Sequence, residues 1–205
     1  MKEQIGTLQV TGTGTVQVAP DEAIVHLVVI TEARTAAEAV ASNAKRAQAT
    51  IDAVSAQPNH GVTTTGPSVS PILKYDSNVT TIVGFRATNG VEVRTKVGYA
   101  AQIYDAGIAA GANESSGITF RVQNERPHRE EALRIAVDEA FNEARIVAKA
   151  ANVELDGPEA IQINATGGPV FHRTEALQAM AVPTPSIPGE LSITASVQIL
   201  FQTRR

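Results

Sequence analysis

The stretch Asn124–Val153, NERPHREEALRIAVDEAFNEARIVAKAANV, decides the fold because it predicts one long amphipathic helix. Apolar residues recur along it at alternating spacings of four and three, which places them on one stripe of an α-helix. The stripe consists of Leu133, Val137, Ala140, Ala144, Val147 and Ala151. Because it is mostly Ala and Val, the layer that covers it can approach closely, and the rest of the chain is expected to supply that layer.

Charged residues lie off this stripe. Glu130, Arg134 and Asp138 are spaced to form consecutive i,i+4 pairs on the solvent face of the helix. The adjacent carboxylates Glu130–Glu131 and Asp138–Glu139 fall on the same face, where solvation is the expected state. Acid–base catalysis would require burial or a pocket to shift a pKa.

Two strands are predicted before the first helix. Thr7–Val18 alternates strictly, with Thr and Gln on the outer face and Leu, Val and Gly on the inner face. Gly12 and Gly14 fall on the inner face, where a missing side chain lets another element pack closely. Gly12-Thr-Gly14 also resembles the start of a dinucleotide loop, but Gln17 replaces the third glycine and no helix follows. Ala23–Thr31 is apolar on both faces, which predicts a central strand.

The first helix opens at Thr35-Ala-Ala-Glu38, which has the sequence of a capping box. Its apolar stripe repeats the spacing of four and three. The residues of that stripe are Val40, Ala44, Ala47, Ile51 and Val54. The helix is expected to end at Gln57–Gly61, which contains Pro58.

An edge strand and a long strand follow. Val62–Tyr75 is extended, and Pro67 and Pro71 share one parity, so both lack a donor on the same lateral side, which predicts an edge strand. Val79–Val97 contains Asn89-Gly90, a tight-hairpin signal. Its apolar residues keep one parity across that dipeptide, which favours one continuous strand, although a three-residue loop with a bulge would also keep the phase.

The remaining elements complete an α+β fold with a mainly antiparallel sheet, two long Ala-rich helices and one short helix. The predicted order is β-β-α-β-β-α-β-α-β-β. The later elements are a short helix at Tyr99–Ala110 ended by Gly111, a strand at Ile118–Val122, the long helix, a strand at Ala160–Ala165, and a last strand at Leu191–Phe201. A Pro-rich loop at 167–189, with a helical turn at Thr174–Met180, precedes the last strand. We expect residues 1–205 to form a single domain.

Composition indicates a globular protein whose core is built from Val, Ile, Leu and Ala. Of the 205 residues, 43% are hydrophobic, 19% are charged and 4% are aromatic. The net charge of −4 gives no reason to expect nucleic acid as a partner. No run approaches the ~20 apolar residues of a membrane span. The start, MKEQIGTLQV, lacks the apolar segment of a secretory signal. As written, the chain is expected to be cytoplasmic, or periplasmic or secreted if an export signal has been removed.

No residue pattern indicates a catalytic, metal or cofactor site. The chain has no Cys, which excludes disulfides and thiolate chemistry. Its histidines lie singly, without metal-ligand spacing, at His26, His60, His128 and His172. We therefore expect no catalytic residues, no metal and no cofactor. Clustering of His60, His128 or His172 with carboxylates would favour an enzyme instead.

An ordered set of short motifs resembles the SIMPL domain family, also called DUF541, over nearly the whole chain. The set consists of Val10-Thr-Gly12-Thr-Gly14 with Ala19-Pro20-Asp21, Gly84-Phe85-Arg86-Ala87, Gly111-Ala112-Asn113, the ladder Ala136, Ala140, Ala144 and Ala148, and Pro188-Gly189-Glu190. Asn152 stands where the family commonly has Gly, and Asn also tolerates the left-handed conformation. The resemblance implies a bacterial α+β protein that self-assembles, with links to stress tolerance or the cell envelope. It implies no catalytic residues.

Three hypotheses follow. The first is a non-enzymatic homo-oligomer assembled through the strand edge 62–75 and the loop 167–189, with a role in stress response or the envelope. The alternative is a binding module that holds a peptide or a small apolar ligand beneath the 167–189 loop. The third is a hydrolase or other enzyme whose site the sequence does not reveal.

Burial of the helix stripe can be tested with Ala140→Leu. The added methyl groups should overpack the interface and lower the free energy of unfolding by about 1–3 kcal/mol. Urea denaturation measures this change. Unchanged stability would mean that Ala140 does not face the core.

Overall fold

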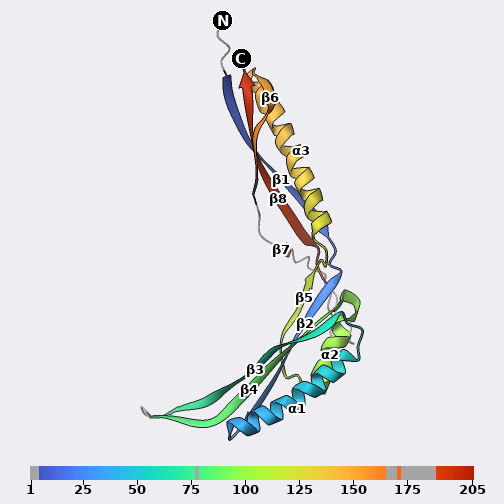
Figure 1. Ribbon diagram of the computed structural model, residues 1–205, viewed down its shortest axis with the longest axis vertical. Helices are drawn as coiled ribbons and strands as arrows, with labels where there is room; N and C mark the ends of the chain where they lie inside the picture. The colour runs from blue at the N-terminus through green and yellow to red at the C-terminus, as the bar shows by residue number, and fades with distance from the viewer. Residues whose placement is uncertain (1–4, 77–78, 165–169, 172–187) are drawn as a thin grey trace. The chain divides into compact units, whose positions relative to one another are not determined.

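The computed structural model describes residues 5–76, 79–164, 170–171 and 188–205, and its ribbon confirms the predicted α+β fold (Figure 1). The elements are β1 Ile5–Val18, β2 Glu22–Ala33, α1 Ala36–Ser55, β3 Gly61–Asp76, β4 Val79–Lys96, η1 Val97–Tyr99, α2 Ala100–Ala110, β5 Glu114–Arg121, α3 Arg126–Ala151, β6 Glu154–Asn164, β7 Val170–Phe171 and β8 Leu191–Arg204. Their order matches the prediction, with the 3₁₀ turn η1 and the two-residue strand β7 added. The strand predicted at Ala160–Ala165 is longer, since β6 begins at Glu154.

The described residues form two compact units with separate hydrophobic cores. One unit contains β1, α3 and β6 to β8, and therefore joins the two ends of the chain. The other contains β2 to β5 with α1 and α2. That residues 1–205 fold as one domain stays a prediction.

In the first unit, β8 lies between β1 and β6 in an antiparallel sheet. The helix α3 packs on the face that carries Val10, Val197, Ile199 and Phe201, and Figure 1 shows it running along β1 and β8. Phe141 of α3 meets Phe201 edge to face, with ring centroids 5.1 Å apart. The other face carries the exposed Thr and Gln residues of β1, as the alternation predicted.

Two glycines of β1 lie directly against the backbone of α3. A Cβ atom placed on Gly12 would lie 2.7 Å from the backbone nitrogen of Ala140 and would also collide with the carbonyl oxygen of Ala136. A Cβ on Gly14 would lie 2.7 Å from the backbone nitrogen of Ala136. The prediction that these glycines admit a closely packed element is therefore confirmed.

The predicted stripe of α3 is partly wrong. The buried residues repeat every four positions, as Ala132, Ala136, Ala140, Ala144 and Ala148. Leu133 and Val137 flank this line, while Val147 and Ala151 are exposed. Closeness of approach explains the shift, because only Ala fits where the helix meets the backbone of β1. The helix ends at Asn152, whose φ of 53° confirms that it takes the left-handed cap position.

In the second unit, the sheet order is β3-β4-β2-β5, so β3 is an edge strand and β2 is central, as predicted. The helices α1 and α2 cover one face, and their core contains Leu27, Val54, Val91 and Ile103. Strand β4 runs without interruption through Asn89 and Gly90, which confirms the continuous strand and excludes a hairpin there.

The capping box of α1 is confirmed, since Thr35 Oγ1 accepts from the Glu38 backbone and the Glu38 carboxylate accepts from the Thr35 backbone. The predicted stripe is again partly wrong, although Ala47 and Val54 are buried as expected. The buried residues are Ala39, Asn43, Ala47, Thr50 and Val54, whereas Val40 and Ala44 are exposed. Polar side chains occupy this face because they are hydrogen-bonded: Asn43 Nδ2 donates to the carbonyl oxygens of Val29 and Ala87, at 2.8 and 3.0 Å.

The close approach of β1 to α3 predicts that Gly12→Ala lowers the free energy of unfolding by about 3 kcal/mol or more, at the upper end of overpacking costs. The reason is that the new Cβ meets helix backbone, which cannot rotate away as a side chain can. Gly157→Ala in β6 is the matched control, because a Cβ there has no atom within 4 Å. Urea denaturation of both variants tests this, and equal stabilities would contradict the close packing.

Candidate interaction surface

One edge strand of the second unit's sheet is β3, which carries the predicted interface segment 62–75. On its inner side β3 pairs with β4 from Gly61 to Asp76, with register shifts at 64–67 and 72–73. Pro67 and Pro71 lie opposite Asn89 and Phe85 in that ladder. Between the shifts, the alternate residues of β3 whose backbone nitrogens face the outer side are Pro67, Val69 and Pro71. Proline has no N–H, so among these three only Val69 can donate a backbone hydrogen bond there. A long hydrogen-bonded ladder with another strand is therefore disfavoured along this stretch.

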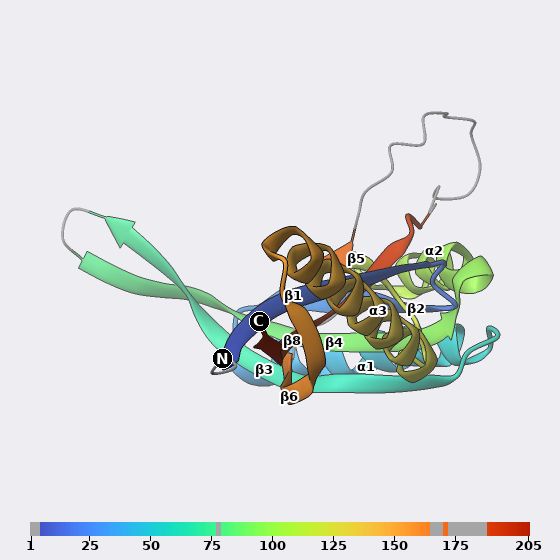
Figure 2. The same cartoon turned by 90° about the horizontal axis from the view of Figure 1, so that it is seen from above.

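Beyond the end of β2, strands β3 and β4 continue as a two-stranded ribbon. Ala33, the last residue of β2, pairs with Phe85, so residues 72–76 and 79–84 have no third strand in the described sheet. Figure 2 shows this ribbon, which we call the distal ribbon, running on past the rest of its sheet. Large apolar side chains are exposed on it, namely Leu73, Tyr75, Val79, Ile82 and Val83. Such a grouping of exposed apolar residues is typical of an interaction site.

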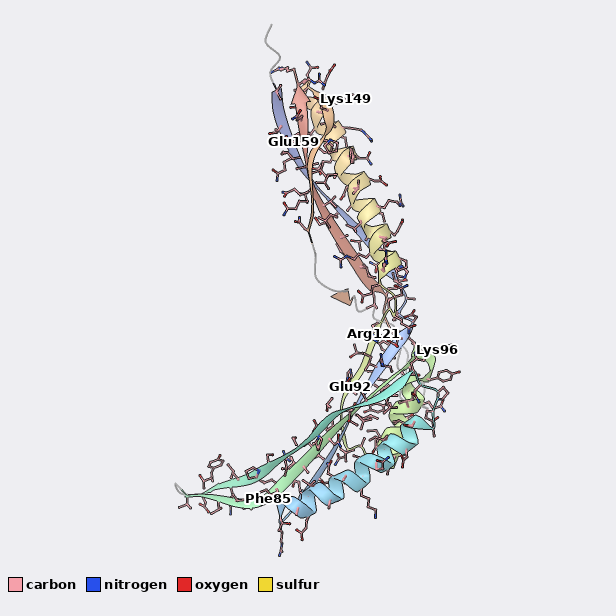
Figure 3. The ribbon with its side chains drawn as sticks, in the orientation of Figure 1. Phe85, Glu92, Lys96, Arg121, Lys149 and Glu159 are labelled. Carbon is pink, nitrogen blue, oxygen red and sulfur yellow. The ribbon has the colours of Figure 1, made fainter. Side chains whose placement is uncertain are left out.

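At the opposite end of the same sheet lies a buried carboxylate. Glu22 is 2% exposed, and its Oε2 accepts from Arg121 Nε at 2.5 Å. His60 Nδ1 lies 3.4 Å from Glu22 Oε1. Figure 3 shows Arg121 at the end of β5, where the chain leaves this unit. The ion pair therefore holds together the strands by which the chain enters and leaves the unit.

The environment of Glu22 keeps it ionised. Burial alone raises the pKa of the Glu22 carboxyl, but the hydrogen bonds and charges of Arg121 and His60 outweigh burial and leave the pKa below its ordinary value. A carboxylate with both oxygens engaged by cationic or donor groups is a poor general base. Although His60 does meet a carboxylate, the arrangement is that of a structural ion pair.

A second polar group crosses the open face of the sheet. His26 of β2 lies between Glu92, 3.3 Å from Nδ1, and Thr119, 3.2 Å from Nε2. The order carboxylate, imidazole, hydroxyl is that of a catalytic triad. However, these residues are neighbours across three adjacent strands, and the Glu92 side chain is 40% exposed. We interpret them as cross-strand polar pairs that stabilise the sheet.

The remaining candidate residues lie on α3 or outside the described residues. His128 lies in the first turn of α3, and His172 lies outside the described residues. Arg134 pairs with Asp138 and Glu131, while Glu130 pairs with Arg126 instead of the predicted Arg134. Glu139 accepts from the backbone N–H of Thr13 at the edge of β1.

Most of the loop 167–189, including the helical turn expected at Thr174–Met180, also lies outside the described residues. A ligand site beneath that loop therefore stays a prediction. Within the described residues no three His, Asp or Glu side chains gather as a metal site. None of the helices in that part of the chain is long and apolar enough to cross a membrane.

Sequence similarity gives the family. The description "SIMPL: Protein of unknown function (DUF541)" matches residues 8–201. The chain belongs to the SIMPL family. Two relatives are the 26 kDa periplasmic immunogenic proteins of Brucella melitensis and Brucella abortus. Each is 27% identical to this SIMPL protein over 220 residues, which cover 100% of the chain and 87% of the relative.

The similarity confirms the family resemblance seen in the sequence motifs, and nothing in either relative's name denotes an enzyme. Both relatives are named as periplasmic, which fits the expected alternative of an exported protein and gives no support to a cytoplasmic one. The motif Gly12-Thr-Gly14 of this SIMPL protein lies within the matched range and forms the glycine contact with α3. That motif therefore serves packing.

The Glu22 ion pair predicts a pH-dependent contribution to stability. Because the folded pKa of Glu22 is lowered, its contribution is complete above the ordinary glutamate pKa of about 4.3 and is lost as the pH falls through the folded pKa. Glu22→Gln should lower the free energy of unfolding at pH 7 by about 1–2 kcal/mol, less than for a fully buried pair because Arg121 is partly exposed.

The measurement is urea denaturation of the wild type and the variant at pH 7 and pH 3. The difference between them should shrink at pH 3. Glu131→Gln, which removes an exposed partner of Arg134, is the control and should change stability little at either pH. A Glu22→Gln deficit of the same size at both pH values would contradict this account.

Proposed function

We propose that this SIMPL protein is a non-enzymatic homo-oligomer of the bacterial cell envelope, with a role in stress response, that assembles through the β3 edge and the distal ribbon. The observation that carries the proposal is the distal ribbon itself. Isolated two-stranded ribbons are marginally stable in water, and this one exposes apolar side chains. Contact with a second copy would bury these side chains and stabilise the ribbon.

Packing of side chains, more than strand pairing, would dominate such an interface. Pro67 and Pro71 limit the donors on the outer edge of β3, whereas the ribbon presents aliphatic and aromatic groups such as Leu73, Tyr75 and Ile82. Burial of apolar area stabilises association by roughly 25 cal/mol per Å² before the costs of association are subtracted. The loop 167–189 remains part of the proposed interface as a prediction.

Two further observations support a non-enzymatic envelope role. The polar clusters around Glu22 and His26 are accounted for by structural ion pairs and cross-strand contacts. The relatives named as periplasmic immunogenic proteins cover the full length of the chain, which supports an envelope location. The stress-related role rests on the family resemblance.

Sedimentation velocity over a range of concentrations tests the assembly. We expect the wild type to sediment as an oligomer, and the triple variant Leu73→Ser, Tyr75→Ser, Ile82→Ser to dissociate at concentrations at least tenfold higher. The control is Ile161→Ser, Ile163→Ser on β6, because these two side chains are about as exposed as Ile82, at 54% and 60% against 59%.

The control variant should assemble like the wild type. A wild type that stays monomeric at every concentration would sink the proposal. Equal dissociation of the ribbon variant and the β6 variant would show that the ribbon is not the interface.

A further inference from the structure

A small pocket lies in the second unit, between the edge strand β3 and the helix α1. Its volume is about 290 Å³. Aliphatic groups from three elements form its walls, with Val40 and Ala44 from α1, Pro67 and Val69 from β3, and Ala87 from β4. The volume is at the lower end of the range for ligand sites and exceeds that of apolar cavities known to hold benzene.

The irregular register of β3 accompanies the pocket. The pairing of β3 with β4 shifts between Thr64 and Pro67, and Gly66 within that interval has a φ of 85°. After the shift, Pro67 and Val69 lie opposite Asn89 and Ala87. These four residues line one side of the pocket, and the small side chain of Ala44 on α1 leaves the space opposite them open.

Two carboxamides, those of Asn43 and Asn89, are among the groups that line the pocket. Both hydrogens of Asn43 Nδ2 are donated to backbone carbonyls, so its Oδ1 is fixed in direction. Asn89 Oδ1 is buried and, among the residues that the structure describes, receives no hydrogen bond. A buried acceptor without a donor costs free energy, which a ligand donor could recover after a small rotation of the Asn89 amide.

The lining contains no charged side chain. A charged ligand would lose its hydration there without gaining a partner of opposite sign. The pocket therefore suits a neutral compound with an apolar body, and the acceptor Asn89 adds a preference for an N–H or O–H group.

We propose that the pocket between α1, β3 and β4 binds a small neutral molecule that has an apolar body and one N–H or O–H donor directed at Asn89. This site is separate from the distal ribbon.

Indole and 1-benzothiophene are suitable probes, because the two have nearly the same shape and only indole carries an N–H donor. The full-length chain contains no Trp, so the emission of bound indole is measured without interfering protein indole fluorescence. Benzothiophene is measured by displacement of indole. Methyl shifts in NMR spectra of the wild type locate the probe without any substitution.

We expect saturable indole binding, with methyl shifts at Val40, Val69 and Ala87. Benzothiophene should bind about three- to tenfold more weakly, the range of one net hydrogen bond. Asn89→Leu should remove this preference. Ala44→Leu, which fills the pocket, should weaken indole at least tenfold, and Ala49→Leu on the exposed side of the same helix should leave it unchanged.

Absence of saturable indole binding would overturn the proposal, and so would methyl shifts confined to other parts of the chain. An indole affinity that is unchanged by Ala44→Leu would show that indole binds outside this pocket, which would also overturn the proposal. Equal affinities of the two probes for the wild type would show that Asn89 accepts no hydrogen bond from the ligand.

Discussion

The backbone of β1 lies directly against the backbone of α3, because Gly12 and Gly14 carry no side chain on the face that the helix covers. The helix carries alanine at every fourth position from Ala132 to Ala148. Dispersion contacts are strongest at such short separations, and few side chains have to be ordered to make them. Larger residues such as Phe141 and Phe201 fill the space beside this line, where helix and sheet diverge. The first unit is therefore organised around a row of its smallest residues.

The second unit also packs its helices closely on its sheet, but with different residues. Gly107 of α2 lies against Leu27 and Val54, so one small residue again admits a close contact. On α1, Asn43 and Thr50 occupy buried positions, and both donate to backbone carbonyls. Buried polar side chains are tolerated when every strong donor is paired. The hydrogen bonds of Asn43 also connect α1 to β2 and β4. They fix the distance between α1 and the strands at the pocket.

Much of the fold follows from patterns that act within one element. Alternation predicted β1 and its Thr/Gln face, the capping box predicted the start of α1, and the parity of Pro67 and Pro71 predicted an edge strand. The continuous β4 was predicted because burial of one face outweighs the turn preference of Asn89-Gly90. The helix stripes were predicted only in part, because hydrophobicity favours Val40 and Val147, whereas tertiary packing selects small or hydrogen-bonded residues at neighbouring positions. The sites were harder to predict. Glu22 and Arg121 meet only through the register of β2 and β5, ninety-nine residues apart in sequence.

The strand pair β3–β4 combines an edge of the sheet with exposed apolar side chains. An edge strand that served only as a boundary would be short, charged, covered, or interrupted by proline or a bulge. The outer edge of β3 is long, and prolines restrict pairing along it. Apolar side chains nevertheless accumulate on the distal ribbon, which has no third strand in the described sheet. Proline and exposed apolar residues together discourage an open-ended ladder while favouring contact through side chains. Closer to the helices, the pairing of the same strand with β4 shifts register beside the pocket that Asn89 lines. Strand β3 thus carries both the surface proposed for a partner, beyond the end of β2, and the pocket proposed for a ligand, at its register shift.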